Sequence, residues 1–210
     1  MSEEKYRDTI EVYNNSLAKI QKFDFKQKKH LDRTIQLSNG NVILDIGCGT
    51  GKDLDYLKNN YCNLLDIGLD RSDAMLNIYK GNSIKGDMRY IPLKDNSCDI
   101  VISNSSLTHL NHRDKEKVLS EVHRVLKRNG IFSMWIQNLY SFPYIKYFKD
   151  FLKTSIKNKG VEEKGYAYNG RHWYYPSKKE MLKILEKSGF EVIDSNSFFS
   201  RWLEFFAKPI

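Results

Sequence analysis

Proline, cysteine and long apolar runs are scarce in this chain of 210 residues, which has four prolines and three cysteines. No apolar run approaches the roughly 20 residues that a membrane-spanning helix needs. The cysteines, Cys48, Cys62 and Cys98, are odd in number and lack the spacing of metal ligands. We therefore expect a reducing, cytoplasmic setting, no metal site and no association with a membrane.

The chain is short enough to be one domain. Residues 1–6 are polar and lack the apolar segment of a secretory signal peptide. Helical patterns over residues 4–20 and 27–37 predict an N-terminal helical cap, residues 1–40. Residues 139–176 interrupt the alternation of strands and helices. We expect them to form an insertion on the substrate side of a single domain that spans residues 1–210.

The net charge of +8 is unevenly distributed. Residues 42–138 are close to neutral, whereas residues 139–189 carry six more basic than acidic side chains. A basic region attracts anionic partners such as nucleic acid, phosphorylated metabolites or a membrane surface. Lysine strongly outnumbers arginine, however, and arginine is the more specific reader of phosphate. A solvated, lysine-rich surface explains the charge equally well.

The most informative segment is an apolar run that leads into an acid and then into three glycines at alternate positions. Val42–Ile46 has few polar residues and is typical of a buried parallel strand. Gly47, Gly49 and Gly51 allow the backbone to turn sharply and to approach a ligand closely. A helix is predicted directly after the turn. Strand, glycine turn and helix form the nucleotide site of an open α/β sheet.

The detail of this turn argues against a dinucleotide site. The dinucleotide fingerprint G-x-G-x-x-G needs a third glycine where this chain has Lys52. Asp45, two residues before the first glycine, suits a cationic ligand that carries no phosphates. The pattern resembles motif I of the class I S-adenosylmethionine (SAM) dependent methyltransferases. Lys52 and Asp45 together disfavour a nicotinamide-dependent reductase.

Two further segments resemble the motifs of this family. Asp70 ends the second predicted strand about 20 residues after the glycine turn, where an acid can reach both ribose hydroxyls. Ser72 is expected to cap a helix over residues 73–79. The resemblance implies that the Asp87 carboxylate accepts a hydrogen bond from the adenine amino group. It also implies that Met88 binds the adenine ring.

The remaining segments continue the alternation of strands and helices. Residues 97–104 are typical of a buried strand, and residues 121–130 of an amphipathic helix that ends in a left-handed cap at Asn129 and Gly130. A strand, a capped helix over 177–187 and two final strands follow. This pattern predicts an α/β fold with a doubly wound, Rossmann-like, seven-stranded, mostly parallel sheet, helices on both faces and an antiparallel last strand. Class I methyltransferases have this fold.

The resemblance implies SAM as cofactor and S-adenosylhomocysteine as its product. The residues that it assigns to SAM lie at or near the ends of the predicted strands. They are Asp45, Gly47, Cys48, Gly49, Gly51, Asp70, Arg71, Asp87, Met88 and Asn104. We interpret Cys48 as a small residue that fills the turn, and not as a nucleophile.

The methyl acceptor is expected over the fourth and fifth strands, because SAM takes the ends of the first three. Candidate residues for binding the acceptor are Tyr13, Trp135, Gln137, Arg171 and His172. His109 follows the fourth strand and could act as a general base near neutral pH. The alternative is a histidine with a structural role at the start of a helix. Residues 158–170 are polar and are expected to form a loop.

Three functions are compatible with these motifs. The first is in-line transfer of a methyl group from SAM to a small molecule, by a monomer or homodimer, with positioning supplying much of the acceleration. The second rests on a resemblance of Cys98-Asp99, His109-Leu110 and residues 135–137 to tRNA wobble-uridine carboxymethyl methyltransferases, which work with a small zinc-binding activator subunit. The third is a non-catalytic SAM-binding protein.

Overall fold

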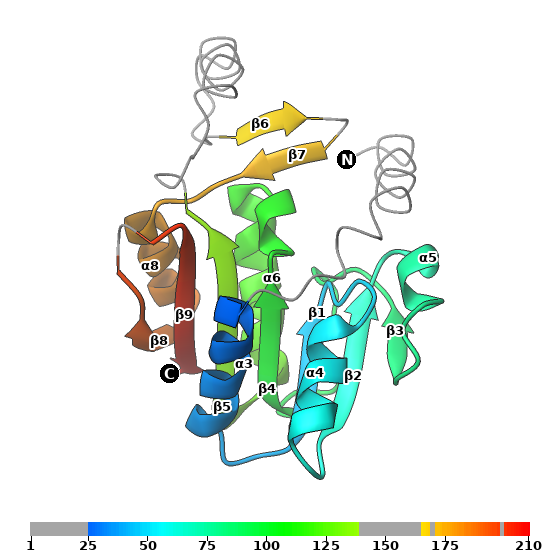
Figure 1. Cartoon of the computed structure of the whole chain (residues 1–210). Coiled ribbons are helices and arrows are strands. Elements are labelled where there is room, and N and C mark those ends of the chain that lie inside the picture. The colour runs from blue at the N-terminus through cyan, green and yellow to red at the C-terminus, as the bar shows by residue number, and fades with distance from the viewer. Residues whose placement is uncertain (1–24, 139–164, 169–170, 198–199) are drawn as a thin grey trace.

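The structure is a computed structural model that describes residues 25–138, 165–168, 171–197 and 200–210 (Figure 1). Those residues form a seven-stranded sheet, helices that flank it, and a separate two-stranded hairpin. Within these ranges, no helix combines the length and the apolar character needed to cross a membrane. Tyr13, the helix expected over residues 4–20 and most of the insertion expected over residues 139–176 lie outside the described residues.

The sheet confirms the expected fold class. Its strand order is β3-β2-β1-β4-β5-β9-β8, in which β9 pairs antiparallel with both β5 and β8 and every other pair is parallel. The strands are β1 (Val42–Ile46), β2 (Leu65–Asp70), β3 (Ser83–Lys85), β4 (Cys98–Asn104), β5 (Leu126–Gln137), β8 (Phe190–Ser195) and β9 (Trp202–Pro209). The hairpin consists of β6 (Gly165–Tyr168) and β7 (Arg171–Tyr174).

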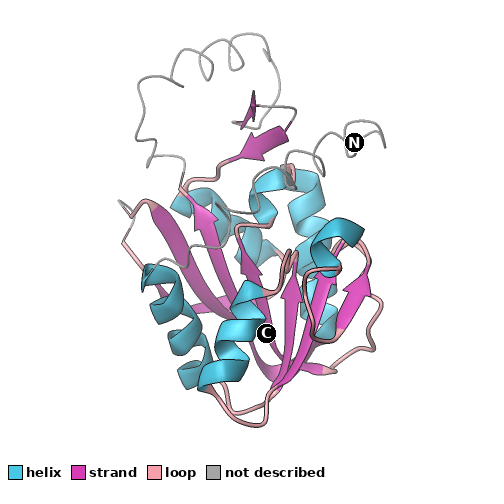
Figure 2. Cartoon of the chain, turned by 45° about the vertical axis from the view of Figure 1, so that its right-hand side comes forward, coloured by secondary structure: helices cyan, strands magenta, loops and turns pink. Residues whose placement is uncertain are grey.

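Helices cover both faces of the sheet (Figure 2). Buried side chains of α3 and α4 pack on one face, and those of α6 and α8 pack on the other. The helices are α3 (Phe25–Leu37), α4 (Lys52–Asn60), α5 (Asp73–Leu76), α6 (His112–Val125), α8 (Lys178–Lys187) and the 3-10 turn η1 (Leu107–His109). A capping box between Ser177 and Glu180 starts α8, as expected for a Ser three residues before a Glu.

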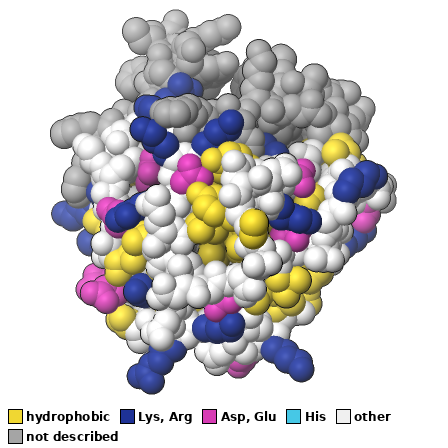
Figure 3. All heavy atoms as spheres, turned by 60° about the horizontal axis from the view of Figure 1, so that its bottom comes forward, with side chains coloured by type: hydrophobic (Ala, Val, Ile, Leu, Met, Phe, Trp, Pro, Cys, Tyr) yellow, Lys and Arg dark blue, Asp and Glu magenta, His cyan; other side chains and the backbone are white. Residues whose placement is uncertain are grey.

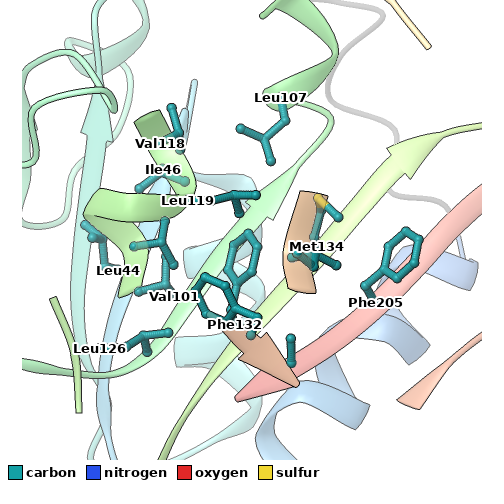
Figure 4. Close-up of a cluster of buried hydrophobic side chains, with 14 of the residues drawn as sticks. Leu44, Ile46, Val101, Leu107, Val118, Leu119, Leu126, Phe132, Met134 and Phe205 are labelled. Atoms are coloured by element: carbon teal, nitrogen blue, oxygen red, sulfur yellow. The ribbon is translucent and has the colours of Figure 1, made fainter. Parts of the chain in front are cut away.

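Side chains of β5 alternate between the two faces, as the period of a strand requires. Phe132 and Met134 are fully buried and lie in the larger core together with Leu119 of α6 (Figure 4). Ser133 lies on the opposite face, where its hydroxyl contacts His30 of α3 at 2.8 Å. One face of this strand therefore builds the core, and the other brings polar groups under α3.

The strands β1, β2 and β4 end side by side, at what we call the carboxyl edge of the sheet. Asp45 pairs with Gly68 of β2 and with Ile102 of β4. Asn104, two residues after Ile102, is therefore level with Gly47 of the glycine turn. The other end of the molecule, turned forward in Figure 3, carries basic and acidic side chains intermingled with hydrophobic groups.

Tyr79 packs directly under the glycine turn. Its side chain is buried, and Cβ atoms placed on Gly51, Gly68 or Gly81 would overlap its ring or hydroxyl. Its hydroxyl donates a hydrogen bond to the buried carboxylate of Asp66. The expected helix over residues 73–79 is shorter in the structure and ends at Leu76. The chain leaves the helix early and inserts Tyr79 between the turn and β2.

The left-handed cap expected at Asn129 and Gly130 is wrong. Helix α6 ends at Val125, and β5 begins at the next residue. Leu126 is buried and pairs with Cys98 in the β4–β5 ladder, so the chain is already extended there. Neither Asn129 nor Gly130 has a positive φ. Pairing with β4 determined this boundary, and the local Asn-Gly signal did not.

The loop expected over residues 158–170 is also partly wrong, because Gly165–Tyr168 form strand β6 and pair with β7. The hairpin leads into Tyr175, which is only 5% exposed. The carbonyl of Tyr174 accepts a hydrogen bond from Lys115 of α6 at 3.4 Å. These contacts anchor the end of the hairpin to the domain.

Replacing Phe132 with Ala should destabilise the fold by about 3–5 kcal/mol, because it leaves a cavity in the larger core between the sheet and α6. Phe132 is fully buried, and its ring lies 5.6 Å from that of Phe190. For a chain of this size the melting temperature should fall by roughly 10 °C. Tyr90→Ala is the matched control, since Tyr90 is 67% exposed. Equal melting temperatures for both variants would contradict the assignment of this core.

Gly51→Ala should destabilise the protein more than Gly49→Ala. Both positions have positive φ, so each Ala carries about 1–2 kcal/mol of backbone strain. Only at Gly51 does the added methyl group overlap Tyr79, which adds about 1–3 kcal/mol. Denaturant unfolding of the two variants measures the difference. The packing of Tyr79 under the turn is refuted if the two free energies of unfolding coincide.

Candidate functional site

The glycine turn leaves a space at the carboxyl edge that atoms of the described residues do not fill. Gly47, Gly49 and Gly51 have φ values of 78°, 56° and 76°, in the left-handed region that favours glycine. A Cβ on Gly47 would overlap Ser106, whereas a Cβ on Gly49 would have no heavy atom of the described residues within 4 Å. The backbone at Gly49 is thus open on one side, as close approach to a ligand requires.

Asp70 fixes the glycine turn to the end of β2. One carboxylate oxygen accepts the N–H of Gly49 at 2.8 Å, and the other accepts the N–H of Ser72 at 2.9 Å. Each oxygen of a carboxylate has a second lone pair, so Asp70 can accept two further hydrogen bonds from a ligand. Ser72 caps α5 through the N–H of Met75, as the sequence predicts.

Asp87 is held by two arginines. The guanidinium of Arg89 contacts both of its oxygens, at 3.0 Å and 2.6 Å, and Arg71 lies 3.5 Å away. Burial raises the pKa of Asp87, but the hydrogen bonds from Arg89 and the charge of Arg71 outweigh it and hold the pKa below its usual value. Asp87 therefore stays an ionised hydrogen-bond acceptor. The neighbouring Met88 lies close to Gly47.

Two buried acids lie beside the turn. Asp45 is 3% exposed and Asp53, in the first turn of α4, is 4% exposed. The oxygens of Asp53 accept hydrogen bonds from the side-chain amides of Gln27 and Asn104, both at 2.7 Å. Burial, followed by repulsion from Asp53 and Asp70, raises the pKa of Asp45 well above its usual value. A bound cation would relieve this repulsion.

Cys48 has the character of a packing residue. Its side chain is 7% exposed, and its N–H donates to the carbonyl of Leu69 at 3.1 Å. Burial, together with the nearby charges of Asp45 and Asp70, raises the pKa of the Cys48 thiol far above its usual value. The reactive thiolate is therefore disfavoured, in line with the interpretation of Cys48 from the sequence.

The acceptor-side candidates gather around the ends of β4 and β5. Asn104 pairs with Trp135, and Gln137 is half-buried at the end of β5. His109 is half-buried in η1, against which β7 packs. Arg171 and His172 belong to β7, but their side chains, like the whole of Tyr13, lie outside what the structure describes.

Three buried side-chain atoms of the described residues have no hydrogen-bond partner, namely His30 Nδ1, Asn104 Oδ1 and Trp135 Nε1. Asn104 and Trp135 are neighbours in the β4–β5 ladder, and the rings of His30 and Trp135 lie 6.0 Å apart. Buried polar atoms are almost always paired in folded proteins. Their concentration beside the carboxyl edge indicates a place where a polar ligand or water binds.

The sequence analysis missed three residues of this region, Gln27, His30 and Asp53. A signal existed for Asp53, because it precedes Leu54 and Leu57 on the buried face of α4. Burying an acid in an apolar stripe costs free energy of folding unless hydrogen-bond or charged partners compensate, so such an acid indicates partners or a function. Gln27 and His30 lie one turn apart on α3, and nothing in the local sequence distinguishes them from the polar residues around them.

Comparisons with known proteins agree with this geometry. A family model described as a methyltransferase domain matches residues 44–134. Protein MJ1252 of Methanocaldococcus jannaschii is 33% identical over 204 residues, which cover 88% of this chain and 77% of that protein. The demethylmenaquinone methyltransferase of Thermotoga maritima is 30% identical over 190 residues, which cover 84% of this chain and 82% of that protein.

A solved structure shows the same fold. It is a 1,6-didemethyltoxoflavin-N1-methyltransferase from Burkholderia thailandensis with bound 1,6-didemethyltoxoflavin and S-adenosylhomocysteine. The TM-score is 0.72 at 14% identity, and the match covers 100% of this chain and 90% of that one. The strand order, the glycine turn and the acids around it, Asp45, Asp53 and Asp70, agree with what these relatives indicate. The chain therefore belongs to the class I SAM-dependent methyltransferases.

Proposed function

We propose that this methyltransferase acts on a small molecule with a polar group, which binds at the carboxyl edge over β4 and β5. The observation that carries the proposal is the buried Trp135 Nε1–H, which has no acceptor within the described part of the protein. An oxygen or nitrogen of the methyl acceptor would satisfy it. The demethylmenaquinone and didemethyltoxoflavin methyltransferases, by their names, also modify small molecules.

The proposed SAM site follows the geometry of the carboxyl edge. The open side of Gly49 gives the cofactor its place, Asp70 has lone pairs for the ribose hydroxyls, and Asp87 is an ionised acceptor for the adenine amino group. When bound, SAM would supply a methyl group on a sulfonium: a nucleophile of the acceptor would bond to the methyl carbon in line as the carbon–sulfur bond breaks and S-adenosylhomocysteine leaves. The full set that we propose is Asp45, Gly47, Cys48, Gly49, Gly51, Asp70, Arg71, Asp87, Met88 and Asn104.

On the acceptor side we propose Trp135 and Gln137 as binding residues and His109 as the general base. The place of His109 in η1, next to the end of β4, supports this role. We also keep Tyr13, Arg171 and His172 as proposed acceptor-binding residues, on the basis of the sequence alone. We place the protein in the cytoplasm as one domain, acting as a monomer or homodimer. If tRNA is the acceptor, a small activator subunit is the expected partner.

Gly49→Ala should abolish or strongly weaken cofactor binding while the protein remains folded. The added methyl group meets no heavy atom within 4 Å in the part of the chain that the structure describes, so it enters the space that we assign to SAM. Titration calorimetry with S-adenosylhomocysteine should show an affinity at least about tenfold lower than that of the wild type, and circular dichroism should show a folded variant. Wild-type affinity in this variant would refute the proposed site.

Transfer of a radiolabelled methyl group identifies the class of acceptor. The purified protein and labelled SAM are added to a lysate of the source organism, which is then separated into small-molecule, RNA and protein fractions. We expect the label among small molecules. The Gly49→Ala variant is the control for transfer by enzymes of the lysate.

Label in RNA would overturn the small-molecule proposal and favour the tRNA function. In that case, addition of an activator subunit should increase transfer. Absence of any label above the control, with cofactor binding intact, would favour a non-catalytic SAM-binding protein.

A further inference from the structure

The carboxylate of Asp53 dictates how two side-chain amides are oriented. A carboxylate can only accept hydrogen bonds, so Gln27 and Asn104 must both turn their NH2 groups toward it. Both contacts measure 2.7 Å, one to each oxygen. The orientation of the Asn104 amide is therefore a chemical consequence of its partner. Its Oδ1 necessarily points away from Asp53.

This Oδ1 atom is buried and has no hydrogen-bond partner in the described residues. Asn104 is level with Gly47 in the sheet, because Ile102 pairs with Asp45. Ser106, two residues further on, donates to the carbonyl of Ile46 at 2.8 Å. The end of β4 thus borders the glycine turn, and Asn104, which carries the unpaired acceptor, lies at this end.

The charges around this acceptor favour a cation. Asp45 and Asp53 are both buried beside the turn, and Asp70 is close enough to raise the pKa of Asp45. Burial also raises the pKa of Asp53, although its two amide partners and the charges of Lys52 and His30 act in the opposite direction. A donor with a positive charge would bind the free oxygen of Asn104 and reduce the repulsion among the acids.

We propose that Asp53 is a positioning residue of the cofactor site: it locks the Asn104 amide so that Oδ1 accepts a hydrogen bond from the ammonium group of SAM. The inference rests on the proposed SAM site. Gln27 takes part as the second partner of Asp53, and it links the first turn of α3 to recognition of the cofactor. The ammonium group is common to SAM and S-adenosylhomocysteine.

Substitution of Asp53 with Asn tests this role. The new side chain has an NH2 group in place of one carboxylate oxygen, so either Gln27 or Asn104 would face a donor where it now finds an acceptor. Reorientation of Asn104 would turn its NH2 group toward the ammonium. Affinity for S-adenosylhomocysteine should fall at least about tenfold, the effect of one hydrogen bond to a charged group.

The decisive readout is a comparison with 5′-methylthioadenosine, which keeps the adenosine and the sulfur but lacks the ammonium and carboxylate groups. Its affinity, measured by calorimetry, should not change in Asp53→Asn. A purely structural role of Asp53 would weaken both ligands alike, and this result would overturn the proposal. Asn104→Leu, a second variant of similar volume, should show the same selective loss.

Asp55→Asn is the matched control, because Asp55 lies on the same helix and is exposed. It should bind both ligands as the wild type does. If Asp53→Asn retains wild-type affinity for S-adenosylhomocysteine, the positioning role is refuted while the SAM site stands. If the wild type itself binds neither ligand, the proposed cofactor site fails first.

Discussion

The site depends on the packing of one aromatic ring against backbone that has no side chains. Tyr79 occupies the volume that side chains at Gly51, Gly68 and Gly81 would need. The ring therefore supports the glycine turn from below, while Asp70 holds it from the side through the N–H of Gly49. Together these contacts keep open the space beside Gly49. The glycines serve two purposes, since some admit a ligand and others admit a residue of the protein itself.

A second constraint comes from the polar contacts between α3 and the sheet. The Thr34 hydroxyl donates to the carbonyl of His30, so the hydroxyl of Ser133 donates to Thr34 and accepts from His30 Nε2. The other ring nitrogen of His30, Nδ1, lies 3.6 Å from a carboxylate oxygen of Glu204. An apolar helix face would tolerate sliding, whereas this chain of donors and acceptors fixes the helix in one register. Gln27 reaches Asp53 from the same helix.

The sequence predicted those features in which local pattern and tertiary structure agree. Val42–Ile46, the glycine turn and Asp70 were identified because apolar runs and glycine spacing report directly on a parallel sheet. The end of α6 was missed because the pairing of Leu126 with Cys98 outweighs the preference of Asn129 and Gly130 for a helix cap. The partners of Asp53 come from positions 27 and 104, and such long-range hydrogen bonds leave no periodic signal.

The arginines around Asp87 bear on nucleobase discrimination. With Arg89 and Arg71 beside it, this carboxylate is kept ionised and carries no proton to donate. In the proposed site it faces the six-position of the purine. An amino group there would donate to Asp87, whereas a keto oxygen would be repelled by the charged carboxylate and left without a donor in a half-buried place. The same two arginines would thus distinguish adenosine from inosine without touching the base.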